Sequence, residues 1–192
     1  MNLAFISEAG GGKDFLAQHT ITNYGYTRYA FATHVNNVAK KWFPDLYGDG
    51  KEKPRWLLQA IGTKFREVDP DVWIKAMLKE IDEEASNRRR YMEIQEHIVV
   101  TDCRMPNEYQ ALKERGFTFI RIHVDGEIRK QRLLDRKDKF SENDMNHHTE
   151  SFYDQFECDF VITNNGTQEV AYRQLDDVID IVRAKVGVES SG

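Results

Sequence analysis

The chain has 192 residues, of which 40% are hydrophobic, 31% are charged and only 4 are proline. This composition excludes a largely disordered or collagen-like chain and indicates a globular protein with a sizeable core. The 27 lysines and arginines are outnumbered by 32 aspartates and glutamates, and the formal net charge of −5 argues against a protein that coats nucleic acid or anionic lipid.

Short, β-rich apolar runs alternate along the chain with helical patterns. The predicted strands are Leu3–Ile6, Tyr26–Tyr29, Ile98–Thr101, Phe119–Val124 and Phe160–Thr163. The predicted helices are Lys13–Thr22, Pro54–Arg66, one opened by Asp69 and Pro70, Pro106–Arg115 closed by Gly116, Glu127–Arg136, and Thr167–Val186 ending at Gly187. Nearly continuous apolarity is typical of buried parallel strands, so we predict an α/β fold with helices on both faces of a parallel sheet.

Two stretches lack a period and are predicted to be loops. Asp45–Lys53 is rich in glycine and charge, whereas Lys137–His148 is long and polar, as mobile lids often are. No internal repeat or linker is evident, so we expect a single domain over residues 1–192.

The compartment follows from weaker signals. Cys103 and Cys158 form no CxxC unit or metal-ligand pair, which indicates reduced thiols. No apolar run approaches the ~20 residues of a membrane span, and the N-terminal NLAFI is too short for the apolar core of a secretory signal. We therefore expect a cytoplasmic protein that has neither a membrane nor a nucleic acid as a partner.

The most informative motif is SEAGGGKD at residues 7–14, between the first strand and a helix. It matches the phosphate-loop pattern GxxxxGK[ST] at Gly12 and Lys13. Glycines let backbone amides turn toward phosphate oxygens, and a helix N-terminus adds partial positive charge. A flexible strand-to-helix turn is the alternative. The residues predicted to bind nucleotide phosphates are Ala9, Gly10, Gly11, Gly12, Lys13, Asp14 and Phe15.

The motif departs from its pattern at two positions. Ser7 holds the place of the first glycine, and Asp14 replaces the serine or threonine that normally contacts Mg²⁺. The Asp14 carboxylate could hold the metal, directly or through water, or could simply favour the helix N-terminus.

Several segments, in order over nearly the whole chain, resemble the phage-type deoxynucleoside monophosphate kinases. They are the GKD phosphate loop, PRWLLQAIGTKFREVDPDVWI (54–74), VVTDCRMPNEYQAL (99–112), HHTES (147–151) and VITNNGT (161–167). GGKDFL also resembles the phosphate loop of phosphomevalonate kinase. The resemblance implies a P-loop fold with a five-stranded parallel sheet of order 2-3-1-4-5, an acceptor-binding helical region over about 33–90 and a lid over about 132–150. It also implies transfer of the γ-phosphoryl group of ATP to a deoxynucleoside monophosphate, with Mg²⁺.

The candidate acceptor-phosphate ligands come from two segments. Asp102 and Arg104 follow the strand Ile98–Thr101, at the carboxyl edge where open α/β sheets bind ligands. Asp102 can hold Mg²⁺ water and Arg104 can clamp a phosphate, unless the two form an internal ion pair. The resemblance makes Arg66 a second ligand, although an arginine at a helix end also suits the helix dipole.

The lid carries the remaining charged candidates. Arg132 and Arg136, at i and i+4, would surround the γ-phosphate, or else form a solvated basic face. We expect no metal at His147 and His148, because adjacent side chains diverge. A phosphate acceptor is mostly ionised at neutral pH, so no general base is needed. The resemblance allows substrate contact by His148 and Glu150, whereas helix capping is the other reading of HHTES.

Base recognition depends on less specific signals. Phe31 could stack on the acceptor base or pack in the core, and Gln59 could read a base edge. Asn164, Asn165 and Gly166 resemble the loop beside the ATP adenine, although an ordinary Asn-Gly turn has the same residues. A kinase of another phosphorylated metabolite and a non-catalytic nucleotide-binding switch remain alternatives. We also expect that the protein can form a homodimer and that, if a phage encodes it, it acts in the cytoplasm of the host.

Overall fold

The computed structural model describes residues 1–91, 97–135 and 152–189. Its five strands form one sheet of order β2-β3-β1-β4-β5, which confirms the predicted order. The central strand β1 pairs in parallel with both β3 and β4, and β4 pairs in parallel with β5. The strands are β1 (Asn2–Ser7), β2 (Thr27–Tyr29), β3 (Ile98–Val100), β4 (Thr118–His123) and β5 (Phe160–Thr163).

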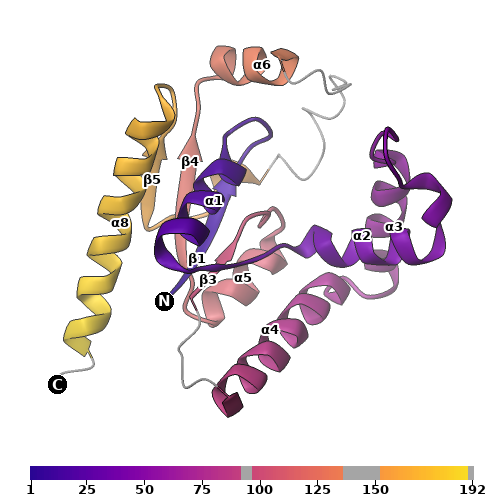
Figure 1. Cartoon of the computed structure of the whole chain (residues 1–192), viewed down its shortest axis with the longest axis horizontal. Coiled ribbons are helices and arrows are strands. Elements are labelled where there is room, and N and C mark those ends of the chain that lie inside the picture. Colours follow the sequence, from indigo (N-terminus) through magenta and orange to yellow (C-terminus); the bar gives the residue numbers. More distant parts are fainter. Residues whose placement is uncertain (92–96, 136–151, 190–192) are drawn as a thin grey trace. The chain divides into compact units, whose positions relative to one another are not determined.

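A described α-helix follows each strand, and three come in succession between β2 and β3 (Figure 1). The described helices are α1 (Lys13–Tyr24), α2 (Phe31–Trp42), α3 (Arg55–Val68), α4 (Val72–Tyr91), α5 (Pro106–Glu114), α6 (Gly126–Asp135) and α8 (Gln168–Glu189), with short 3-10 turns η1 (Pro44–Leu46) and η3 (Tyr153–Gln155). Two helix predictions need correction. α2 was not predicted as a separate helix, although most of it lies in the helical region expected over about 33–90. α8 continues past Gly187 because one glycine lowers helix propensity, by about 1 kcal/mol, without ending the helix.

The chain divides into two compact units, Met1–Arg28 with Glu96–Gly192, and Tyr29–Gln95. The second unit contains α2, α3 and α4, and includes the whole region of about 33–90 that is predicted to bind the acceptor. Within it the indole of Trp73 donates a hydrogen bond to the Gly62 carbonyl, 3.2 Å away, which joins α4 to α3. The extent of a single domain, an acceptor region and a lid stays a prediction.

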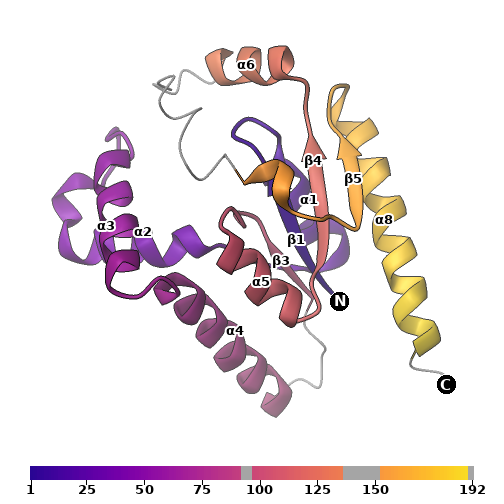
Figure 2. The same ribbon diagram turned by 180° about the vertical axis from the view of Figure 1, so that it is seen from behind.

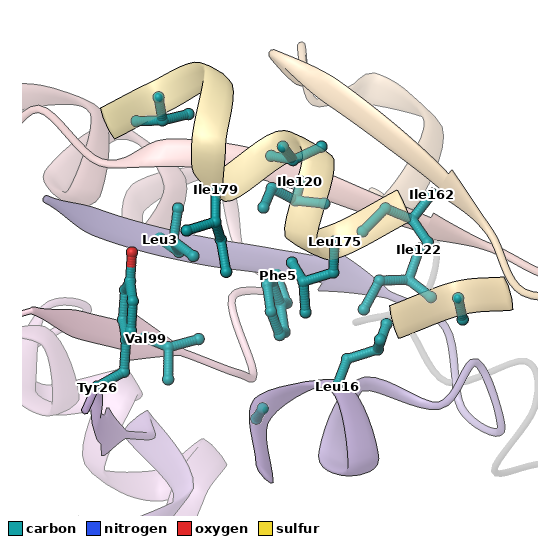
Figure 3. Packing of buried hydrophobic residues seen from close by; sticks show 14 residues of the cluster. Leu3, Phe5, Leu16, Tyr26, Val99, Ile120, Ile122, Ile162, Leu175 and Ile179 are labelled. Atoms are coloured by element: carbon teal, nitrogen blue, oxygen red, sulfur yellow. The ribbon is translucent and has the colours of Figure 1, made fainter. Parts of the chain in front are cut away.

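The core of the first unit lies between the sheet and the helices α1 and α8 (Figure 3). Leu175 and Ile179 of α8 are fully buried against strand residues such as Phe5 and Ile120. The opposite face of the sheet carries α5, seen in front in Figure 2. The ring centroids of Tyr109 on α5 and Phe119 on β4 lie 4.4 Å apart. Within the described ranges, no helix combines the length and apolarity that a membrane span requires.

Candidate functional site

The loop between β1 and α1 has the backbone of a phosphate-binding turn. Gly10 and Gly12 adopt left-handed φ angles of 83° and 95°, a region that other residues occupy at a cost. The Gly11 amide donates to the Glu8 carbonyl at 3.1 Å and closes the turn. Lys13 then begins α1, whose first backbone N–H groups lack partners within the helix and are available to an anion.

The close packing of this loop explains its run of glycines. A Cβ added at Gly11 would lie 2.2 Å from the Ser7 hydroxyl oxygen, and one at Gly12 would lie 2.4 Å from the side-chain nitrogen of Asn164. Real Cβ atoms do not approach so closely, so the loop admits no side chain there without moving. The side chain of Ser7, at the position of the usual first glycine, therefore occupies the space that a side chain at position 11 would need.

Asn164, predicted from the resemblance, lies directly against the phosphate loop. Its side-chain NH₂ donates to the Gly11 carbonyl at 2.9 Å, and the residue is only 1% exposed. Its backbone amide donates to the His123 carbonyl at the end of β4. Asn165 accepts a hydrogen bond from the Asp125 amide at 2.9 Å, and Gly166 follows on the surface. The turn after β5 thus helps to fix the phosphate loop.

Asp14 pairs with two cations. The Lys13 ammonium lies 3.0 Å from one carboxylate oxygen, and the Arg28 guanidinium donates to the other at 2.6 Å. Arg28 also donates to the Thr101 hydroxyl, 3.1 Å away at the end of β3. Partial burial acts to raise the pKa of Asp14, but the charges and hydrogen bonds of Lys13 and Arg28 outweigh it and lower that pKa. Sequence reasoning missed Arg28, because a strand arginine gives no local signal of a partner 14 positions away.

The residues fit a Mg²⁺ ion shared with nucleotide phosphates better than one held by protein alone. Among the described residues there is no cluster of three or more His, Cys, Asp or Glu side chains that could cage a metal. Mg²⁺ at kinase sites needs only one or two carboxylates because the substrate phosphates supply other ligands. Asp14, at the loop, and Asp102, just past β3, are the two carboxylates predicted to contact such an ion.

A buried carboxylate shapes the loop that carries Asp102 and Arg104. Glu108, 3% exposed, accepts hydrogen bonds from the backbone amides of Arg104 at 2.9 Å and Met105 at 3.1 Å. Cys103 is buried in the same loop, and this burial raises the pKa of its thiol well above the usual value. The loop is therefore held by its own helix α5. Glu108, at the third position of that helix, accepts from the N-cap amide as in a capping box, but Met105 at the N-cap lacks the hydroxyl of that motif, so the motif is incomplete and could not have identified Glu108.

Helix α6 packs against the phosphate loop from beyond the carboxyl edge of the sheet (Figures 1 and 2). Arg129 forms an ion pair with Glu8, and a Cβ at Gly10 would lie 3.1 Å from both the Arg129 Cγ and the Leu133 Cγ. The predicted lid residue Arg132 lies half-buried on the same helix. Arg129 is a contact that sequence reasoning missed.

Three other predicted residues belong to the second unit. Phe31 is 2% exposed, which favours core packing over base stacking, whereas Gln59 is exposed on α3. Arg66 is half-buried and donates to the Gly62 carbonyl at 3.3 Å within the second unit. The predictions for Arg136, His148 and Glu150 fall outside the described residues.

Comparisons with known proteins agree on a kinase fold. The model of the deoxynucleotide monophosphate kinase family matches residues 51–175. No curated protein matches the sequence. A sugar kinase from Janibacter sp. HTCC2649 is 16% identical, with 95% of this chain and 96% of that chain covered and a TM-score of 0.59. Shikimate kinase from Acinetobacter baumannii is 13% identical, with 96% and 93% covered and a TM-score of 0.54. At these identities the solved structures support the fold alone.

Proposed function

Because the chain belongs to the deoxynucleotide monophosphate kinase family, we propose that it transfers the γ-phosphoryl group of ATP to a deoxynucleoside 5′-monophosphate, giving ADP and a deoxynucleoside diphosphate. The observation that carries this proposal is the glycine loop at residues 10–12, packed against Asn164 and followed by Lys13 at the start of α1. Such a loop at the carboxyl edge of a parallel sheet binds phosphates in many nucleotide-dependent enzymes.

The chain's own residues bind and neutralise phosphate charge. The amides of the loop and the first turn of α1 donate to phosphate oxygens, and the Lys13 ammonium offsets the charge of the terminal phosphates. Arg132, on the helix that packs on the loop, adds positive charge beside the transferred group. Catalysis of this kind needs positioning and electrostatic stabilisation rather than a protein nucleophile.

Asp14 and Asp102 would hold the metal. Mg²⁺, when bound, screens the charges of the phosphates and orients them. Asp14 keeps its charge at neutral pH, because Lys13 and Arg28 lower its pKa. Arg28 and Lys13 also orient the Asp14 carboxylate, so a metal would share Asp14 with these two cations.

The acceptor phosphate would be held by arginines. Arg104, on a loop fixed by Glu108, and Arg66, half-buried on α3, are the proposed ligands, because guanidinium groups bind phosphate oxygens in pairs. The acceptor's own phosphate oxygen is the nucleophile and is already mostly ionised at neutral pH. No side chain therefore needs to remove a proton. For recognition of the acceptor base, the proposed residue is Gln59, which would form hydrogen bonds with the edge of the base.

A coupled assay tests the proposal directly. Purified protein, ATP and Mg²⁺ are combined with each common deoxynucleoside and ribonucleoside monophosphate, and ADP release is followed. We expect turnover with at least one deoxynucleoside monophosphate and background rates without an acceptor. Lys13→Ala and Arg104→Ala should each lower kcat/KM by at least about 100-fold, since each removes charge stabilisation of the transition state.

Matched controls separate site effects from unfolding. Lys79→Ala and Arg173→Ala remove exposed side chains from α4 and α8 and should leave kcat/KM within about twofold. ATP consumption that no monophosphate accelerates would exclude the proposal. Turnover only with other phosphorylated metabolites would favour the second kinase reading, and tight ATP binding without any turnover would favour a nucleotide-binding switch. A role in dNTP synthesis, a phage source with action in the host cytoplasm, and a homodimer stay predictions.

A further inference from the structure

The phosphate loop contains a carboxylate that opposes its proposed task. Glu8 follows Ser7 directly, within the turn that Gly11 closes through the Glu8 carbonyl. A negative charge there repels a triphosphate, and at an effective dielectric constant of about 20 the repulsion stays significant over several ångströms. Something must therefore cancel the charge of Glu8 if the loop is to bind an anion.

Arg129 is in the right place to do so. Its guanidinium pairs with the Glu8 carboxylate, and the two side chains are only 17% and 27% exposed, so solvent and salt screen the pair weakly. The aliphatic part of Arg129 packs over Gly10, beside Leu133 one helical turn later. Arg129 therefore joins α6 to the phosphate loop in two ways, through its ion pair with Glu8 and through the packing of its aliphatic part on Gly10.

We propose that Arg129 is a positioning residue, which cancels the charge of Glu8 and holds α6 against the phosphate loop so that the loop accepts a triphosphate. The inference rests on the proposed function only in that the loop binds ATP; it does not depend on the acceptor. It also connects the loop to the helix that carries Arg132, because Arg129 and Arg132 lie three residues apart on α6.

A charge cycle tests this inference. Binding of ATP, ADP and AMP is measured by calorimetry without an acceptor, for the wild type, Arg129→Met, Glu8→Gln and the double variant. Arg129→Met exposes the ligand to an unpaired carboxylate, so we expect ATP affinity to fall by at least about tenfold, ADP affinity by less and AMP affinity least. Glu8→Gln removes the repulsion and should not lower the ATP affinity. The double variant carries neither charge, so its ATP affinity should return to within about threefold of that of the wild type.

Each other outcome overturns the inference. A double variant that binds ATP as weakly as Arg129→Met would mean that Arg129 contacts the nucleotide itself, for which its buried Nε, without a hydrogen-bond partner among the described residues, would be available. An equal loss for ATP, ADP and AMP would indicate a purely structural role. Arg129→Lys, which keeps the charge, should retain ATP binding within about threefold and covers the case in which Arg129→Met does not fold.

The same measurements separate this inference from the proposed function. A wild type that binds ATP but phosphorylates no acceptor would remove the proposed reaction and leave the charge cycle intact. A wild type that binds no ATP would remove both. Arg173→Met, on the exposed surface of α8, is the matched control and should not change any of the three affinities.

Discussion

At the scale of single residues, Lys13 and Arg28 together lower the pKa of Asp14. The Asp14 pKa is lower in the folded protein than its ordinary value, because Lys13 and Arg28 outweigh the opposing effect of burial. A carboxyl group shifted in this direction stabilises the fold above its unfolded pKa, and the contribution is lost as the pH falls through the folded pKa. Asp14 is half-exposed, so we expect this contribution to stay below about 1 kcal/mol.

Arg28→Met should therefore raise the Asp14 pKa toward its ordinary value and slightly lower the stability near neutral pH, with the difference from the wild type vanishing as the pH falls below the folded pKa. Carbon-detected NMR of the side-chain carboxyls measures the titration, and Asp14→Asn assigns the signal by its disappearance. An unchanged midpoint in Arg28→Met would mean that Lys13 alone sets the pKa. The matched variant Arg173→Met, exposed on α8, should leave the Asp14 midpoint unchanged.

Residues could be proposed for the site where a motif was local, and partners that are distant in sequence could not; the binding roles themselves stay predictions. Lys13 and Gly12 could be found because the loop pattern, the strand and the helix are contiguous. Asn164 could be named only through the family resemblance, because its partner Gly11 lies 153 positions away in the sequence. Arg28 and Arg129 have no such signal, because an ion pair depends on where the fold brings a charge and not on the residues beside it.

At the scale of elements, α1 offers an internal comparison, since a left-handed glycine flanks each end. Gly25 has a φ of 70° and open space around its Cβ position, whereas Gly12 has a φ of 95° and would contact Asn164 and Phe15. Gly25→Ala should lower stability by about 1–2 kcal/mol through backbone strain alone and leave ATP binding unchanged. Gly12→Ala adds the clash with the turn after β5.

We therefore expect Gly12→Ala to weaken ATP binding by at least about tenfold, beyond a loss of stability like that of Gly25→Ala. Urea denaturation measures the stability of both variants and calorimetry measures ATP affinity. Equal ATP affinities in the two variants would show that the close packing of Gly12 is irrelevant to the nucleotide.

Helices and strands whose ends are marked by a residue signal, such as a capping glycine or the end of an apolar run, were predicted well. A helix without an N-cap signal was not. Gly116, with its φ of 70°, ends α5 as expected, and the four longer apolar runs are strands within one or two residues. The bounds of α2 were not predicted within the expected helical region, although Phe31, Val35 and Ala39 repeat at intervals of four and are buried. Its N-cap is Ala30, which offers no side-chain hydrogen bond, so the helix begins without the signal that marks many helix N-termini.

At the scale of the whole molecule, hydrophobic runs predicted the α/β class, but the strand order came from the resemblance. Consecutive apolar strands fit several parallel orders, because burial on both faces looks alike in each of them. In the observed order, β1 pairs with both β3 and β4, which places the phosphate loop after the central strand, next to the loop that follows β3. The site thus follows from topology, which no single segment encodes.

The stability of the first unit should depend on the contact between α8 and the sheet. Leu175 is fully buried there beside Phe5 and Ile162, whereas Ile181, on the same helix, is 46% exposed (Figure 3). Leu175→Ala should lower the free energy of unfolding by about 2–5 kcal/mol, because it removes a buried side chain and leaves a cavity. Ile181→Ala, the matched control, should lower it by less than about 1 kcal/mol. Urea denaturation measures both variants, and a loss in Leu175→Ala no larger than in Ile181→Ala would mean that α8 contributes little to this core.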